Sequence, residues 1–203
     1  LERLKSPVAN ESEFFARNLA HFSPMLHGHG VKALAFRERQ PWNRDILAGE
    51  MLAAFRQSGL RTIALTTGTM PAERRMAYFQ NIDAVSLDLK AFTDAFYVQQ
   101  TGAQLSQVLE TLLHLYHETG CWLEIRTGLI PGVNDHPIEL DAMTQWLYKH
   151  LGHEVPLHFS LRNTVGMTNR FSPGSVSLLQ KARKIAQGNG LSHVYVDHPD
   201  CPD

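Results

Sequence analysis

The segment from Asp83 to Phe92 reads DAVSLDLKAF and decides the fold class of this chain. Its apolar and polar residues alternate, which predicts a β-strand because successive side chains of a strand point to opposite faces. Asp88 and Lys90 therefore share one face near the carboxyl end of the strand, before a loop expected at Thr93. Ligands bind at that end of the strands in open sheets and barrels of the α/β class. The pair is either part of such a site or an ion pair without a ligand.

Segments with the period of a helix alternate with strand-like segments along the rest of the chain. Besides 83–92, strands are predicted at 31–36, 61–66, 121–130, 155–160 and 192–196. Helices are predicted at 10–26, 45–57, 71–79, 104–119, 138–151 and 173–187. Strands separated by helices are typical of βαβ units, so we expect one α/β domain over residues 1–203, built on a parallel sheet.

Composition excludes several classes of protein. The chain has 203 residues, of which 43% are hydrophobic, which is enough for one sizeable core. Its net charge of −1 argues against nucleic-acid binding as the main activity. No apolar run approaches the roughly 20 residues that cross a bilayer, and no signal peptide opens the sequence, so we expect a cytoplasmic protein without a membrane partner. Cys121 and Cys201 cannot form a disulfide framework.

Polar side chains collect where the predicted strands end. Because parallel strands end at one edge of a sheet or barrel, these groups predict a single site there, although strand ends of any α/β protein are polar. The residues alone indicate an α/β barrel that binds an anion or a zwitterion. The polar groups are Arg37 to Pro41, Thr66 to Thr69, Asp88 with Lys90, Glu124 with Arg126, His158 to Arg162, and Asp197 with His198.

Two of these groups have a second interpretation. Glu124 and Arg126 are either part of the site or a buried ion pair that fills a barrel. His158 is either a ligand contact or a core histidine with its hydrogen bonds satisfied. A weaker hypothesis is a metal site made of His193, His198 and Cys201.

Three segments resemble the radical SAM superfamily, in the branch of the AmmeMemoRadiSam-system enzymes and the pyruvate formate-lyase activating enzymes. They read IDAVSLDLKAF at 82–92, EIRTGLIPGVND at 124–135 and VPLHFS at 155–160. The turn 66–68 is similar to the family's Thr-Asn-Gly, with Thr67 in place of Asn. The resemblance covers roughly residues 31–196.

The resemblance implies a partial, open TIM-type barrel of parallel strands with outer helices. S-adenosylmethionine and a [4Fe–4S] cluster would lie at the carboxyl ends of the strands, and reduction of the sulfonium would release a 5′-deoxyadenosyl radical. An acid and a base side by side suit the amino and carboxylate groups of the cofactor. The cofactor-binding residues implied in this way are Thr67, Gly68, Asp88, Lys90, Arg126 and His158.

The sequence departs from the family at three places. The Cys-x-x-x-Cys-x-x-Cys loop that holds the cluster does not occur in it; from the family's layout we expect this loop, with the first strand, near or beyond Leu1. Where the branch has Thr-Tyr-Asn-Glu-Pro, this chain has RERQP at 37–41. Gln40 thus stands where the family has the acid that contacts the amino group of the cofactor, unless Glu38 takes over that role. Cys201 resembles one half of the family's terminal Cys-Pro-x-Cys.

Two functions follow from the resemblance and its departures. One is a radical SAM enzyme whose cluster-bearing segment lies outside these 203 residues. The alternative is a cluster-free barrel that acts as a binding or regulatory partner. Whether the chain catalyses a reaction by itself stays open. Activating enzymes act on a glycyl-radical protein, so a protein substrate or partner is one implication, and other members of the family act on small molecules.

Overall fold

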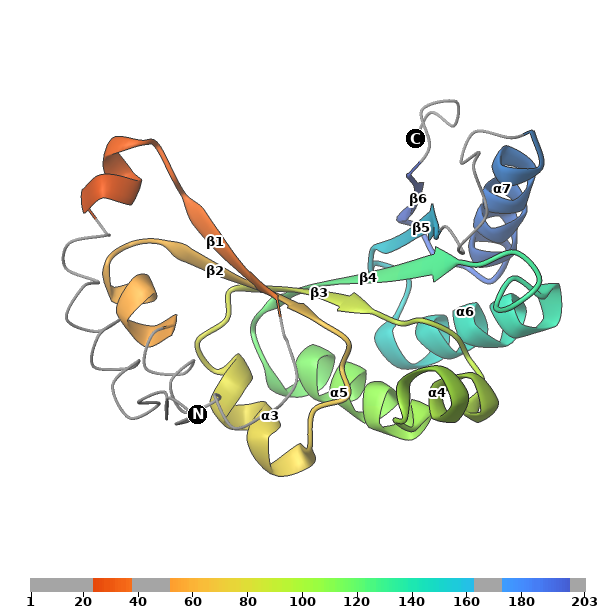
Figure 1. The fold of residues 1–203 in the computed structure, drawn as a ribbon, viewed down its shortest axis with the longest axis horizontal. Coiled ribbons are helices and arrows are strands. Elements are labelled where there is room, and N and C mark those ends of the chain that lie inside the picture. The colour runs from red at the N-terminus through yellow and green to blue at the C-terminus, as the bar shows by residue number, and fades with distance from the viewer. Residues whose placement is uncertain (1–23, 38–51, 163–172, 198–203) are drawn as a thin grey trace, which may run out of the picture.

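The computed structural model describes residues 24–37, 52–162 and 173–197, and a parallel β-sheet runs through all three ranges (Figure 1). Its strand order follows the chain, from β1 to β6, and every neighbouring pair is parallel. The open sheet with helices confirms the expected α/β partial barrel. The strands are β1 (Ala33–Arg37), β2 (Arg61–Thr66), β3 (Ala84–Asp88), β4 (Trp122–Leu129), β5 (Leu157–Leu161) and β6 (Val194–Val196).

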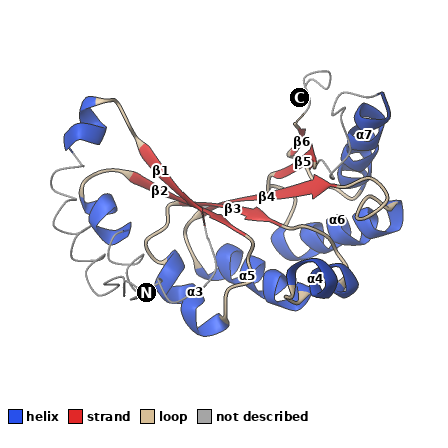
Figure 2. Ribbon diagram, viewed as in Figure 1, coloured by secondary structure: helices blue, strands red, loops and turns tan. Residues whose placement is uncertain are grey.

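The helices that the structure describes cover one face of the sheet and leave its other face open (Figure 2). Shorter helical segments at 24–28 and 52–57 agree with the ends of two predicted helices, whose remaining residues lie outside the described ranges. No helix among the described residues is long and apolar enough to cross a membrane. The longer helices are α3 (Ala72–Phe79), α4 (Asp94–Thr101), α5 (Leu105–Glu118), α6 (Pro137–Leu151) and α7 (Pro173–Gly188).

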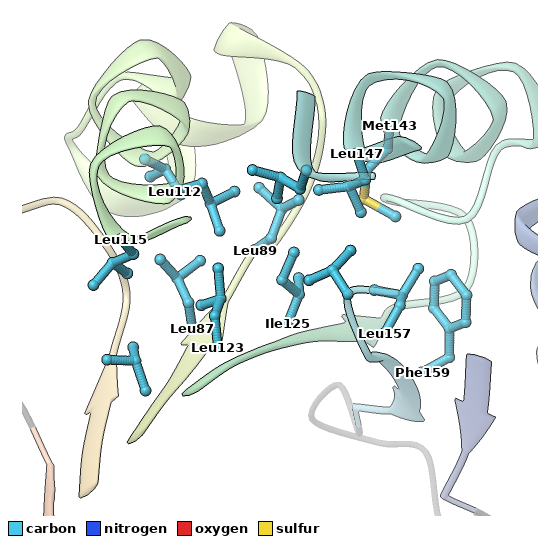
Figure 3. Close-up of a cluster of buried hydrophobic side chains, with 14 of the residues drawn as sticks. Leu87, Leu89, Leu112, Leu115, Leu123, Ile125, Met143, Leu147, Leu157 and Phe159 are labelled. Carbon is cyan, nitrogen blue, oxygen red and sulfur yellow. The ribbon is translucent and has the colours of Figure 1, made fainter. Parts of the chain in front are cut away.

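The hydrophobic core lies between the sheet and these helices (Figure 3). Leu87 of β3 and Ile125 of β4 point toward the helices and are fully buried, as are Leu112 of α5 and Leu147 of α6. Each such side chain contributes about 1.5–3 kcal/mol of hydrophobic free energy relative to an exposed one. Because strand side chains alternate, Ser86 and Asp88 of β3 and Glu124 and Arg126 of β4 face the opposite, concave side of the sheet.

β3 is shorter than predicted. It ends at Asp88, and the backbone beyond it makes hydrogen bonds to side chains instead of to a neighbouring strand. The Lys90 N–H donates to Tyr97 Oη at 3.0 Å, and the Lys90 carbonyl accepts from Asn134 Nδ2 at 2.6 Å. The Phe92 N–H donates to Glu139 Oε1 at 2.6 Å. The prediction of a strand through Phe92 is therefore wrong beyond Asp88, because these tertiary contacts replace the ladder.

Helix α4 replaces the loop predicted after Thr93. The Thr93 side chain accepts a hydrogen bond from the Phe96 N–H at 3.4 Å, as an N-cap residue does, and Gly102 ends the helix with φ of +69°. Both signals are present in the sequence. The prediction was wrong because α4 buries little besides Tyr97, so its hydrophobic period is weak.

Asp83 joins the amino ends of β2 and β3. Its Oδ2 accepts hydrogen bonds from the Thr62 N–H at 2.8 Å and the Thr62 hydroxyl at 3.1 Å. Arg61 and Arg56 lie 3.3 and 3.4 Å from its Oδ1. Burial raises the pKa of the Asp83 carboxyl, but the bonds from Thr62 and the two guanidinium groups outweigh burial, so the pKa lies below its ordinary value.

We expect Asp83→Asn to lower the free energy of unfolding by about 1 kcal/mol at pH 7, because the amide oxygen can still accept the bonds from Thr62 but no longer carries the charge that strengthens them. A lowered folded-state pKa stabilises the fold above the unfolded-state value of about 3.9, and this contribution is lost as the pH falls through the folded-state pKa. Urea unfolding at pH 7 and at pH 3 measures the difference, with exposed Glu73→Gln as the control. An equal loss at both values of pH would contradict this account.

Candidate functional site

A pocket of about 300 Å³ opens on the concave face, at the carboxyl ends of the strands. We call it the carboxyl-edge pocket. It is lined by residues from β1 to β5, so side chains far apart in the sequence meet in it, as the strand-end motifs predict. Its lining residues include Arg37, Thr67, Ser86, Asp88, Lys90, Arg126 and Arg162.

Asp88 and Lys90 form an ion pair inside this pocket. Lys90 Nζ lies 2.6 Å from Asp88 Oδ2, and the two side chains are 25% and 22% exposed. The pair is therefore partly shielded from water but open to a ligand. The residues therefore form the predicted ion pair and also line a cavity, and their role in ligand binding stays a prediction.

Arg162 is a site residue that the sequence analysis named only as the end of a polar motif. Its Nη2 donates to Asp88 Oδ2 at 2.8 Å, the same oxygen that Lys90 contacts. Arg162 follows β5, so its side chain must cross β4 to reach β3. Gly128 of β4 leaves room for this, because a Cβ atom there would lie 2.5 Å from Arg162 Cγ and Nε.

Arg126 lies opposite Asp88 in the pairing of β3 with β4. Its side chain is exposed and has no hydrogen bond or ion pair with the described residues. Glu124 instead accepts a hydrogen bond from Trp122 Nε1 at 3.0 Å and lies 3.6 Å from His158 Nε2. The interpretation of Glu124 and Arg126 as a buried pair is therefore wrong, because the concave face of the open sheet meets solvent.

His158 lines an adjoining pocket of about 350 Å³. Ser86, Arg126 and Ser160 line both pockets, so the two are neighbours on the concave face. The imidazole stacks on Tyr195 with 4.9 Å between ring centres, and its side chain is 33% exposed. His158 Nε2 has no hydrogen-bond partner within the described ranges. His158 is therefore not a core histidine with its hydrogen bonds satisfied. Its side chain lies on the same face of the sheet as the ion pair of Asp88 and Lys90.

Thr67 and Gly68 are adjacent in the sequence but differ in whether they line the pocket. Thr67 lines the carboxyl-edge pocket. Gly68 is buried with φ of +74°, and a Cβ atom there would lie 3.0 Å from Leu87 Cδ1, on the helix side of the sheet. Its carbonyl accepts a hydrogen bond from the Thr111 hydroxyl at 2.7 Å. Gly68 therefore shapes the turn that presents Thr67 and does not line the pocket itself.

A groove of about 600 Å³ lies at the opposite edge, beside the amino ends of β2, β3 and β4. Cys121, Asp83 and His114 line it, and burial raises the pKa of the Cys121 thiol. Among the described residues, no group of three His, Cys, Asp or Glu side chains could hold a metal ion.

Several predicted residues cannot be placed by the structure. Gln40, Glu38, His198 and Cys201 lie outside the described residues. Of the three residues in the metal-site hypothesis, His193 is the one described, and its Nε2 lies 3.0 Å from Glu154 Oε2.

Comparison of the sequence with known proteins identifies one informative relative. No family model matches the chain. The uncharacterized protein MJ0808 of Methanocaldococcus jannaschii is 31% identical over 141 residues, which are 70% of this chain and 41% of that protein. The chain thus spans about two fifths of the length of this relative.

Comparison of the structure with solved structures finds similar folds, among them the following two. A domain of pyruvate-formate lyase-activating enzyme from Bacteroides vulgatus has a TM-score of 0.70 and 17% identity, over 82% of this chain and 99% of that domain. SuiB of Streptococcus suis, bound to S-adenosylmethionine, has a TM-score of 0.65 and 9% identity, over 90% of this chain and 42% of SuiB. The chain therefore has the fold of these two proteins, and the partial barrel expected from its resemblance to the activating-enzyme branch of the radical SAM superfamily is confirmed.

Proposed function

We propose that this chain is the barrel of a radical SAM protein of the activating-enzyme type and that its carboxyl-edge pocket binds S-adenosylmethionine. The observation that carries the proposal is the pair of Asp88 and Lys90 in a pocket at the strand ends, 2.6 Å apart. The similarity of the fold to SuiB, which was solved with S-adenosylmethionine bound, supports it.

The residues of the pocket fit the methionine end of this cofactor. Lys90 Nζ can donate charge-assisted hydrogen bonds to the carboxylate. Asp88 Oδ1 accepts no hydrogen bond from the described residues, since Lys90 and Arg162 both contact Oδ2, so Oδ1 can accept from the ammonium group. Thr67 adds a hydroxyl to the same wall. When bound to a reduced cluster, the cofactor supplies a 5′-deoxyadenosyl radical that abstracts hydrogen.

The described residues do not fit the [4Fe–4S] cluster. Cys121, the cysteine among the described residues, lies in the groove at the amino ends of the strands, at the edge opposite the carboxyl-edge pocket. A cluster needs several cysteine ligands near the cofactor. Its ligands in this proposal therefore come from outside the described residues.

Anaerobic reconstitution of the complete protein with iron and sulfide tests the proposal. We expect absorption near 400 nm, and we expect S-adenosylmethionine with a reductant to yield 5′-deoxyadenosine, measured by liquid chromatography. Binding of S-adenosylmethionine without a cluster and without cleavage would favour the cluster-free alternative. A complete protein that neither binds nor cleaves the cofactor would overturn the proposal.

A further inference from the structure

The carboxyl-edge pocket carries an excess of positive charge. Among the described residues, four basic side chains line it, and Asp88 is the one carboxylate. The excess is therefore three positive charges within a cavity of about 300 Å³. The basic residues are Arg37, Lys90, Arg126 and Arg162.

Asp88 cannot balance these charges. A single oxygen, Oδ2, contacts both Lys90 at 2.6 Å and Arg162 at 2.8 Å. The guanidinium groups of Arg37 and Arg126 have no ion pair with any described residue, and both side chains are exposed. Arginine presents planar donors that suit carboxylate and phosphate oxygens, so two such groups remain available for a ligand.

The Arg162 side chain reaches the pocket because position 128 of β4 is a glycine and has no side chain. Without Gly128, the Arg162 side chain could not follow its present path over the sheet, because a Cβ atom would overlap with its Cγ, Nε and Cδ atoms at 2.5–2.8 Å. Arg162 is 55% exposed, so its ion pair with Asp88 stabilises the fold little. Its place in the pocket is better explained by a ligand than by stability.

The proposed cofactor does not neutralise the pocket. S-adenosylmethionine carries one carboxylate, one ammonium and one sulfonium group, so its net charge is positive. Its binding beside Arg126 and Arg162 would bring like charges together in a partly desolvated cavity, which is unfavourable. A second ligand with several negative charges would offset this repulsion.

We infer that the substrate of this site is a small molecule that carries a multiply charged oxyanion, either a phosphate group or a set of carboxylates, bound by Arg37, Arg126 and Arg162. The inference rests on the proposed function, since it names the substrate of the same cavity. A cavity of about 300 Å³ is at the low end of the usual range for one small ligand, so the cofactor and the substrate would also occupy the adjoining pocket of about 350 Å³, which shares Ser86, Arg126 and Ser160. Arg162 is then a specificity-determining residue, and Gly128 is a positioning residue.

Calorimetric titration of the complete protein with inorganic phosphate, citrate and acetate, at constant ionic strength, tests the inference. We expect phosphate or citrate to bind and acetate to bind at least tenfold more weakly. Tighter phosphate binding indicates a phosphorylated substrate, and tighter citrate binding a polycarboxylate; either supports the inference. Equal, weak binding of all three anions would overturn it.

Two substitutions and a control locate the binding. Arg162→Ala should weaken the binding of the preferred anion at least tenfold, the size of one lost charge-assisted hydrogen bond of about 1.4 kcal/mol or more. Gly128→Ala should weaken it similarly while keeping the guanidinium group, because it displaces the Arg162 side chain. Arg61→Ala removes an arginine at the amino end of β2 and should leave anion binding unchanged. Unchanged affinity in Arg162→Ala would contradict the assignment.

Titration of the same preparations with S-adenosylmethionine distinguishes failure of the inferred anion site from failure of the proposed function. Binding of the cofactor without binding of any multiply charged anion overturns the inference and leaves the proposed function standing. Binding of the anion without the cofactor supports the anion site and removes the proposed function.

Discussion

Asn134→Ala is expected to lower the free energy of unfolding by about 3 kcal/mol, because each buried polar group left without a partner costs about 1–3 kcal/mol. Asn134 is 2% exposed and makes three hydrogen bonds. Its Nδ2 donates to the Lys90 carbonyl at 2.6 Å and to the Gly128 carbonyl at 3.0 Å, and its Oδ1 accepts from the Ile130 N–H at 2.6 Å. It therefore joins the ends of β3 and β4 where the candidate site lies.

Urea unfolding measures this loss, and Asp135→Ala is the matched control. Asp135 lies in the same turn, and its Oδ1 accepts a hydrogen bond from the exposed Gly132 N–H at 2.9 Å, so its loss should cost much less. If Asn134→Ala and Asp135→Ala proved equally stable, the three hydrogen bonds of the Asn134 side chain would not be the element that joins the two strands.

The double substitution Asp88→Ala with Lys90→Ala is expected to weaken binding of S-adenosylmethionine about 30-fold or more while the barrel stays folded. Loss of one charge-assisted hydrogen bond, at about 2 kcal/mol, gives a factor of about 30, and the two side chains remove more than one. The fold survives because Tyr97 and Asn134 hold the backbone of Lys90 independently of its side chain.

Equilibrium titration of the complete protein measures this effect. The control is His153→Ala with Glu154→Ala, which removes another pair of contacting polar side chains before the amino end of β5, with 2.7 Å between His153 Nδ1 and Glu154 Oε1 and both side chains exposed. It should bind the cofactor as the unmodified protein does. Circular dichroism shows whether both variants are folded. Unchanged affinity in the Asp88 and Lys90 variant would mean that the cofactor, if it binds, uses other residues.

The sheet could be predicted from the sequence because each strand carries a local signal. Alternation in β3 and helices of suitable length between strands indicate parallel βαβ units without knowledge of any distant contact. The end of β3 could not be predicted in this way. It depends on the Tyr97 hydroxyl and the Asn134 amide, which lie 7 and 44 residues after Lys90. Helix α4 was missed for a different reason. Its capping residues, Thr93 and Gly102, are clear in the sequence, but its amphipathic pattern is too weak to indicate a helix between them.

The candidate site was predictable only where neighbours in sequence are neighbours in space. Asp88 and Lys90 share a face at a spacing of two, so period two brings them together. The contact between Arg162 and Asp88 spans 74 residues and depends on the missing side chain of Gly128, so no local pattern indicates it. The interpretation of Arg126 as half of a buried pair assumed that side chains fill the interior of the barrel, whereas Arg126 is exposed on the concave face of the sheet.

A crystal structure of the complete protein with S-adenosylmethionine would show whether the carboxyl-edge pocket holds the methionine end of this cofactor. We expect the carboxylate of the cofactor within hydrogen-bond distance of Lys90 Nζ and its ammonium group beside Asp88 Oδ1. A cofactor found in the groove lined by Cys121 and Asp83, or one that leaves Lys90 paired only with Asp88, would contradict it.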